Sequence, residues 1–100
     1  MKMTSALFVS AALLAAAPAL ADEALAKAKG CTACHDVKKK LVGPPYAEVA
    51  KKYKADKAAP AMLQTSVIKG STGKWGQIPM PPNKVTDDEA KKLVAWILSL

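Results

Sequence analysis

Residues 29–35 read Lys29-Gly30-Cys31-Thr32-Ala33-Cys34-His35. Two thiols stand three positions apart, and an imidazole directly follows the second one. This C-x-x-C-H pattern is typical of the covalent attachment of a c-type haem. Each thiol adds to one haem vinyl group as a thioether, and the next residue places its imidazole beneath the iron as the proximal ligand. Cys31, Cys34 and His35 are therefore the first predicted site residues.

Three other uses of the two cysteines agree less well with the sequence. A thioredoxin-like redox pair needs a strand–helix–strand context, and no strand-like segment precedes Cys31. A structural zinc site needs four ligands, whereas Cys31, Cys34 and His35 supply three. A disulfide between the two cysteines would not explain the adjacent histidine. Haem attachment accounts for all three residues together.

The N-terminus predicts export. Lys2 is followed by a mostly apolar stretch, Ala6–Ala17, and then by the small-x-small sequence Ala19-Leu20-Ala21. This is the layout of a secretory signal peptide, and the apolar stretch is shorter than the roughly 20 residues that span a bilayer as a helix. We expect residues 1–21 to be a cleaved signal peptide and residues 22–100 to form one domain. Because bacteria attach this haem outside the cytoplasm, we expect a periplasmic protein without stable membrane insertion.

Composition bounds the size and the partners of this domain. Its 79 residues are near the limit below which a core usually needs a staple, and its apolar side chains are mostly alanine. We therefore expect the cofactor to fill the middle. All 15 basic residues of the full chain are lysines, against 8 acids, for a net charge of +7, and residues 22–100 keep 14 of these lysines and all 8 acids, for a net charge of +6. They indicate either a solvated basic surface or a docking surface for acidic redox partners. Nucleic-acid binding is not expected, because the basic runs lack interleaved aromatic residues.

The pattern along the first half of the chain is helical. Asp22 is a candidate N-cap for a first helix that ends at Gly30. Pro45 can take the first position of a second helix that runs to about Lys54. The spacing of four apolar side chains predicts the buried face of this helix, namely Tyr46, Val49, Ala50 and Tyr53.

The second half predicts two more helices separated by a loop. A third helix over 59–69 is less regular because of residues 65–67, Thr-Ser-Val, which leaves open a short or displaced helix. Residues 70–84 are rich in glycine and proline and predict a loop. Thr86 and Glu89 form a capping box for the last helix. Its apolar stripe consists of Leu93, Trp96, Ile97 and Leu100.

The second iron ligand can be narrowed by elimination. His35 is the only histidine, so ligation by two histidines is excluded. Met62 lies in the third helix, where filling the core is the simpler role. Met80 lies among three prolines, in a stiff loop that can hold a thioether against a metal with little entropy to lose. Met80 is the predicted sixth ligand, and a lysine at high pH is the alternative.

Four motifs follow one another along residues 22–100. They are Lys29-Gly30-Cys31-x-x-Cys34-His35, Val42-Gly43-Pro44, Trp75-Gly76-x-Ile78-Pro79-Met80-Pro81-Pro82 and Trp96-Ile97-Leu98. With them the chain resembles the small bacterial class I monohaem cytochromes c of the c-551/c-552 type. The resemblance implies an all-α fold, with about four short helices wrapped round one haem and with the first and last helices crossed. It also implies single-electron transfer in the periplasm between respiratory donors and a terminal reductase or oxidase.

The resemblance further implies roles for three residues around the ligands. The carbonyl of Pro44 would accept a hydrogen bond from His35, which fixes the ring and tunes the metal. The indole N–H of Trp75 would reach a haem propionate, with plain packing as the simpler alternative. Asn83 would brace the Met80 loop by hydrogen bonding, with an ordinary turn asparagine as the alternative.

These residues favour an electron carrier over an enzyme. With Met80 on the iron, nothing can bind or react there. A peroxidase or gas sensor needs an open distal face and usually an acid–base residue, whereas the lone histidine is used by the iron and the chain has no arginine. A fixed haem subunit of a larger complex is the other alternative to a soluble monomer.

Overall fold

The computed structural model describes the chain from residue 18 to residue 100, with side chains from residue 22 onward. Extended pairing in this part is confined to one bridge between Ser71 and Met80. The prediction of an all-α fold is confirmed, and residues 1–17 of the predicted signal peptide lie outside the described residues. The elements are α1 (Pro18–Ala28), a 3-10 turn η1 (Cys31–Ala33), α2 (Tyr46–Tyr53), α3 (Ala59–Lys69) and α4 (Asp87–Leu98).

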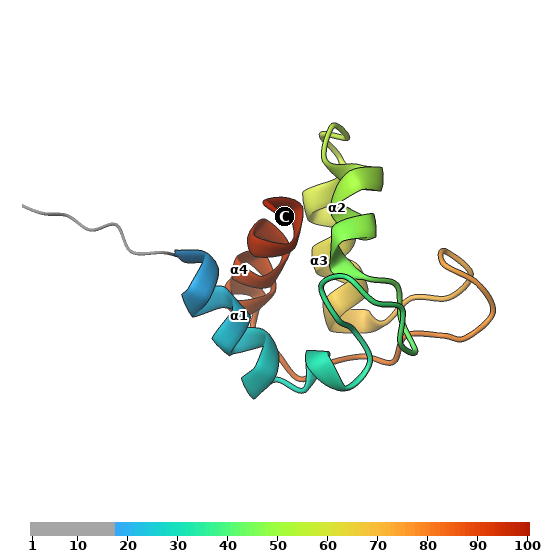
Figure 1. Cartoon of the computed structure of the whole chain (residues 1–100), viewed down its shortest axis with the longest axis horizontal. Helices are drawn as coiled ribbons and strands as arrows, with labels where there is room; N and C mark the ends of the chain where they lie inside the picture. The colour runs from blue at the N-terminus through green and yellow to red at the C-terminus, as the bar shows by residue number, and fades with distance from the viewer. Residues whose placement is uncertain (1–17) are drawn as a thin grey trace, which may run out of the picture.

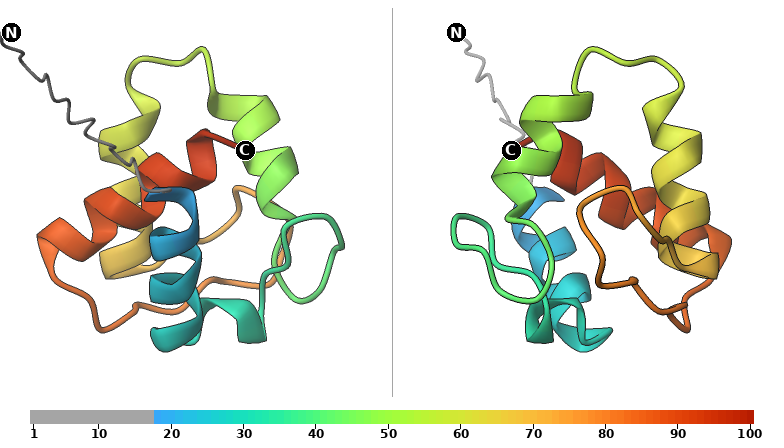
Figure 2. Two further views of the ribbon diagram at one scale, coloured as in Figure 1. Left: turned by 60° about the vertical axis from the view of Figure 1, so that its left-hand side comes forward. Right: turned by 90° about the vertical axis from the view of Figure 1, so that its right-hand side faces the viewer.

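Helix α4 is the hub of the described fold, because it packs against α1, α2 and α3. Helix α1 lies beside α4, while α2 and α3 lie on the other side of the molecule (Figure 1). Viewed from the side, α1 crosses α4 at an angle (Figure 2), as expected for the first and last helices. The two long connections, residues 29–45 and 70–86, lie at the same end of the molecule (Figure 1).

The core follows the predicted apolar faces. Leu93 and Val94 on α4 are almost fully buried. Because these two neighbours point to different sides of the helix, α4 buries more than the single predicted stripe, as a helix with three partners requires. The buried residues of this core are Ala26, Tyr46, Val49, Val67, Ala90, Leu93, Val94, Trp96 and Ile97, and Tyr53 and Leu100 pack against them half-buried.

Helix α1 begins earlier than the sequence indicated. The prediction that Asp22 caps the helix is wrong in this chain, because the helix starts at Pro18. The residues ahead of Asp22 are a proline, which favours the first helical turn, and three strong helix formers, Ala19-Leu20-Ala21. Gly30 ends this helical segment as predicted. Its φ of 78° is positive, a conformation that residues with a side chain rarely adopt.

Helix α2 begins one residue later than expected. Pro45 is the N-cap with an extended ψ of 141°, so the prediction that it occupies the first helical position is wrong by one residue. The N–H groups of Tyr46 and Ala47 donate to the carbonyls of Asp36 and Val37, both at 2.9 Å. The N–H groups at the start of a helix have no acceptor within that helix, and here the carbonyls just after His35 accept from them. The start of α2 is thereby tied to the segment that carries the histidine.

Helix α3 is regular over Ala59–Lys69, so the predicted range is confirmed and the helix is neither short nor displaced. The Thr65 hydroxyl donates to the carbonyl of Ala61 at 3.1 Å, while Ser66 and Val67 are buried. Packing against α4 thus outweighs the weak helix propensity of this stretch.

The capping box at the start of α4 is present as predicted. The Glu89 N–H donates to Thr86 Oγ1 at 3.1 Å, and the Thr86 N–H donates to Glu89 Oε1 at 2.9 Å. Glu89 also forms an ion pair with Lys29 at 3.3 Å, which connects α4 to the segment after α1. The Thr86 N–H and the Lys29 ammonium hold the pKa of the Glu89 carboxyl below its ordinary value of 4.5.

This lowered pKa predicts a specific acid sensitivity. A carboxyl with a lower pKa in the folded state stabilises the fold fully above its ordinary pKa and loses that contribution as the pH falls through the folded value. Glu89→Gln keeps a capping-box acceptor but removes the charge. We expect the variant to be less stable than the parent at pH 7, with a difference that shrinks below about pH 4.5, in urea unfolding at several pH values. Asp88→Asn removes the same charge from the same turn and should leave this pH dependence in place.

Candidate functional site

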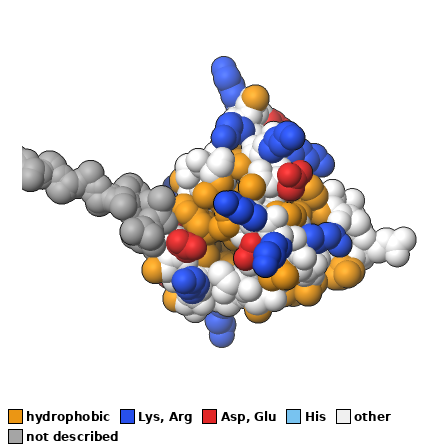
Figure 3. Space-filling view, viewed as in Figure 1, with side chains coloured by type: hydrophobic (Ala, Val, Ile, Leu, Met, Phe, Trp, Pro, Cys, Tyr) orange, Lys and Arg blue, Asp and Glu red, His pale blue; other side chains and the backbone are white. Residues whose placement is uncertain are grey.

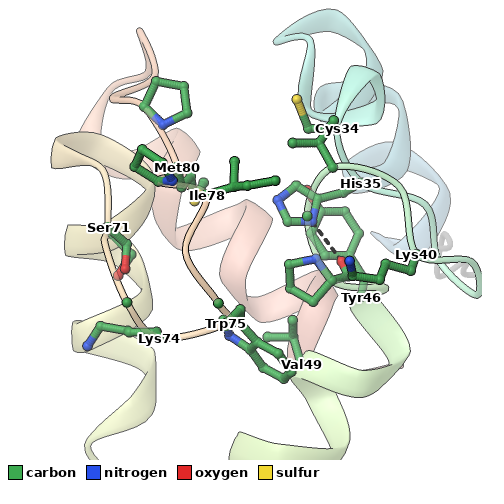
Figure 4. A pocket seen from close by; sticks show the side chains of 18 of the residues that line it. Cys34, His35, Lys40, Tyr46, Val49, Ser71, Lys74, Trp75, Ile78 and Met80 are labelled. Atoms are coloured by element: carbon green, nitrogen blue, oxygen red, sulfur yellow. Dashed lines mark hydrogen bonds between the residues drawn. The ribbon is translucent and has the colours of Figure 1, made fainter.

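A cavity lies between the connection 29–45 and the connection 70–86, with α2, α3 and α4 contributing to its walls. Five of the seven predicted site residues line it, namely Cys34, His35, Pro44, Trp75 and Met80. Figure 4 shows His35 on one wall and Met80 on the facing wall, 45 positions away in sequence. The fold therefore brings the two predicted iron ligands to one cavity.

The ring of His35 is fixed from two sides. Its Nδ1 lies 2.8 Å from the carbonyl oxygen of Pro44 (Figure 4). A carbonyl can only accept, so the proton lies on Nδ1 and the lone pair on Nε2, which points towards the cavity. The Tyr46 ring stacks on the imidazole, with centroids 4.6 Å apart and planes 13° apart. The histidine is therefore held in the tautomer and orientation that a metal ligand needs.

Met80 is held by the backbone on both sides of its loop. Its N–H donates to Ser71 O at 2.8 Å, and its carbonyl accepts from the Ser71 N–H at 3.0 Å. Asn83 connects the same loop to the end of α3, since its Nδ2 and its backbone N–H both donate to Val67 O, at 2.9 and 3.1 Å. These bonds fix where the loop leaves and rejoins the helices.

Two glycines that were not predicted as site residues allow these close approaches. A Cβ on Gly43 would clash with Cε1 of His35, and a Cβ on Gly70 would lie 2.6 Å from the carbonyl oxygen of Met80. Gly70 also has a φ of 88°. Gly43 precedes Pro44 in the Val42-Gly43-Pro44 motif, and this position beside a predicted site residue could have identified it. Tyr46 was predicted only as a core residue, and its stacking on His35 depends on the tertiary fold.

The two cysteines occupy different environments. The 3-10 turn Cys31–Ala33 carries the first of them, and the N–H of His35 donates to Cys31 O at 2.9 Å. Cys34 lines the cavity, whereas Cys31 packs against the core. Burial raises the pKa of the Cys31 thiol, and a hydrogen bond with the Tyr46 side chain partly offsets this. The two thiols are not joined in a disulfide.

The chemistry of the cavity fits a haem with two thioether links. Three large apolar side chains that are exposed, Val42, Trp75 and Ile78, belong to its lining, so a flat apolar macrocycle would cover them. The described lining also holds an imidazole with a free Nε2 lone pair, a thioether and a cysteine thiol. None of the described lining residues carries a carboxylate, which suits a site that binds a macrocycle rather than a bare cation.

An all-α fold around an imidazole, a thioether and a cysteine thiol defines a protein with covalently attached haem. The sequence model of the family "Cytochrome c" matches residues 21–100. The chain belongs to the cytochrome c family, and its cofactor is a c-type haem bound covalently through Cys31 and Cys34.

Two relatives and one solved structure place it within this family. Cytochrome c-552 of Hydrogenobacter thermophilus is 59% identical over 80 residues, covering 80% of this chain and 82% of the relative. Cytochrome c-552 of Nitrosomonas europaea is 53% identical over 95 residues, covering 93% and 91%. The crystal structure of the wild-type Nitrosomonas europaea cytochrome c552 has a TM-score of 0.76 at 48% identity, covering 78% of this chain and 98% of that one. The resemblance to the c-551/c-552 type is confirmed, and the chain is an electron carrier with a c-type haem.

The contact between Gly43 and His35 predicts a local effect of one methyl group. Gly43→Ala places a Cβ against the imidazole, and such overpacking costs about 1–3 kcal/mol. We expect the variant of the haem-loaded protein to lose this stability in urea and to show shifted NMR signals of the His35 ring. Gly73→Ala is the control, because its φ of 82° costs about 1–2 kcal/mol while its Cβ meets open space. It should lower stability and leave the His35 signals in place.

Proposed function

We propose that this protein is a periplasmic single-electron carrier in which His35 and Met80 are the axial ligands of the haem iron. The observation that carries the proposal is their placement on facing walls of one cavity, with the Nδ1 proton of His35 already engaged by Pro44 (Figure 4). The haem supplies a one-electron iron couple. The role of the chain is to hold both ligands in place in either oxidation state.

The two ligands would have different effects on the iron. The hydrogen bond to Pro44 makes Nε2 of His35 a more basic donor and fixes the plane of its ring. The thioether of Met80 is a soft ligand that favours ferrous iron and raises the potential. Met62, the other methionine outside the predicted signal peptide, is half-buried on α3 and is absent from the described cavity lining, which supports Met80 as the ligand.

The same arrangement disfavours chemistry at the iron. Met80 would close the sixth position, and general acid–base catalysis would need a further titratable group beside it. In the described lining the titratable side chains are Cys34, His35, Lys40, Tyr46 and Lys74, and the cysteine and the histidine are committed to the haem. We therefore propose a non-enzymatic protein rather than a peroxidase or gas sensor.

Trp75 and Asn83 would complete the site. Trp75 lines the cavity while 40% of its surface is exposed, which supports its indole N–H as a donor to a haem propionate. The bonds from Asn83 to Val67 support its role as a brace for the Met80 loop. Pro44, Trp75 and Asn83 would thus act around the ligands without touching the iron.

Export and a soluble monomeric state are part of the proposal. Cleavage after Ala21 would leave residues 22–100 as the mature domain, which is close to the range matched by the family model. Among the residues that the structure describes, none forms a helix long and apolar enough to cross a membrane. Gel filtration of the mature protein would decide between a free carrier and a fixed haem subunit of a larger complex.

Basic side chains support docking of acidic redox partners. Lysines are spread over the face of the molecule seen in Figure 3, with fewer acids between them. Two lysines, Lys40 and Lys74, belong to the cavity lining and come from opposite sides of it (Figure 4). Lys91 and Lys92 lie on α4 and outside the described lining. The lysines at the cavity are therefore the better candidates for steering a partner to the haem.

Replacing Met80 tests the ligand assignment. In the ferric parent we expect the far-red charge-transfer band of thioether ligation, and the ferrous parent should not bind carbon monoxide at neutral pH. Met80→Ala should lose the band, bind carbon monoxide and have a lower potential. Met62→Ala is the matched control and should behave like the parent. Rapid carbon monoxide binding by the parent itself would overturn the carrier assignment.

Charge reversal tests the docking surface. Lys40→Glu and Lys74→Glu should each slow the oxidation of the ferrous protein by ferricyanide several-fold at low salt, because the anion is no longer attracted to the cavity. Lys91→Glu makes the same change in net charge and should have a smaller effect. The differences should fade as salt shortens the Debye length to about 10 Å at 0.1 M. Stopped-flow absorbance measures these rates, and equal effects at all three positions would indicate a solvated surface without a docking role.

A further inference from the structure

The ammonium group of Lys52 has an unusual environment for a surface lysine. It lies 4.8 Å from the centroid of the Trp75 ring and 5.3 Å from that of Tyr53. Both distances are within the range of about 6 Å in which a cation is attracted to an aromatic face. The two rings also contact each other edge to face, with centroids 6.3 Å apart and planes 75° apart. One cation and two rings therefore form a single cluster, which we call the Lys52 cluster.

The cluster joins two parts of the molecule that are far apart in sequence. Lys52 and Tyr53 lie in the last turn of α2, while Trp75 lies in the loop that leads to Met80. Figure 4 shows the Trp75 ring against α2, at the bottom of the cavity and below Met80. The contact thus spans from a helix to the loop that carries the proposed iron ligand.

The loop has few other restraints. Its base is closed by the two hydrogen bonds between Ser71 and Met80. Residues 72–79 are all exposed, and in the described structure their backbone makes no backbone hydrogen bond. Gly73 and Gly76 flank Trp75 on either side with positive φ values. Within the protein, the aromatic and cation–π contacts that tie the loop tip to α2 are those of Trp75 with Lys52 and Tyr53.

We propose that Lys52 is a positioning residue, which holds Trp75 against α2 and thereby restrains the loop that keeps Met80 on the iron. This inference rests on the proposed function in one respect, namely the ligation by Met80. The cation lies over the indole while the ring lines the cavity, so loss of the contact would free the loop tip without removing any group from the cavity wall.

The neighbouring lysine supplies a matched control. Lys51 stands one position earlier on α2, is exposed, and makes no ion pair, side-chain hydrogen bond or aromatic contact in the described structure. Lys51→Met and Lys52→Met remove the same charge with a side chain of similar length. Any difference between the two variants therefore reports the contact with the rings rather than net charge.

The experiment measures how readily Met80 leaves the iron. Ferric holoprotein is mixed with excess cyanide, and the rate at saturating cyanide reports the opening of the loop. A cation–π contact at an exposed site corresponds to about a two- to fivefold change, so Lys52→Met should open faster by about this factor. Lys51→Met should match the parent. Equal rates in the two variants, or slower opening in Lys52→Met, would overturn the proposal.

Two further variants separate the ring contact from other effects of the substitution. Lys52→Arg should restore the rate of the parent, because a guanidinium also stacks on aromatic faces. In the background of Trp75→Leu, the change Lys52→Met should have no further effect on the opening rate. Failure of the arginine variant to restore the rate, or an undiminished effect of Lys52→Met without the indole, would each show that Lys52 does not act through Trp75.

A readout independent of the iron ligand distinguishes failure of this inference from failure of the proposed function. Hydrogen exchange of the Trp75 indole N–H, followed by NMR in the holoprotein, should be faster in Lys52→Met than in Lys51→Met or the parent. If the parent lacks the thioether band, the assignment of Met80 fails, while the indole exchange still tests the Lys52 cluster. If the band is present and the exchange rates are equal, the cluster has no positioning role.

Discussion

The packing of α4 against the other three helices is the constraint on which the structure depends. A domain with mostly small apolar side chains cannot close a core around its own residues, so its helices meet along one central helix and leave a cavity beside it. Leu93, Val94 and Ile97 fill the contacts of α4, and Ile97 also belongs to the cavity wall. The same helix therefore stabilises the fold and forms part of the site.

The site consists of two loops that the helices bring together. One carries Cys31, Cys34 and His35 and is attached to the start of α2 through the carbonyls of residues 36 and 37. The other carries Met80 and is attached to the end of α3 through Ser71 and Asn83. In each loop, hydrogen-bonding groups that a helix end leaves without a partner hold a segment that carries a proposed iron ligand. The helices thus position the chemistry without supplying it.

Restraint of the ligands matters for an electron carrier because the iron changes charge while its surroundings should move little. The imidazole is held by Pro44 on one edge and by Tyr46 on its face, so its position is over-determined. The methionine loop is held at its base by two backbone hydrogen bonds, and at its tip Trp75 contacts Lys52 and Tyr53. If Met80 ligates the iron as proposed, the methionine side is the one where ligand exchange would begin.

Much of this could be predicted from residues close together in sequence, and the rest could not. The C-x-x-C-H motif, the single histidine, the proline-rich setting of Met80 and the capping box at Thr86 and Glu89 all act through neighbours in the chain, so sequence alone determined the cofactor, the ligand candidates and the start of α4. The start of α2, the regularity of α3, the need for glycine at positions 43 and 70 and the pairing of Lys52 with Trp75 depend on partners from other elements. Only the tertiary structure decided these, because packing and hydrogen bonding between distant segments outweigh the small local preferences that a sequence displays.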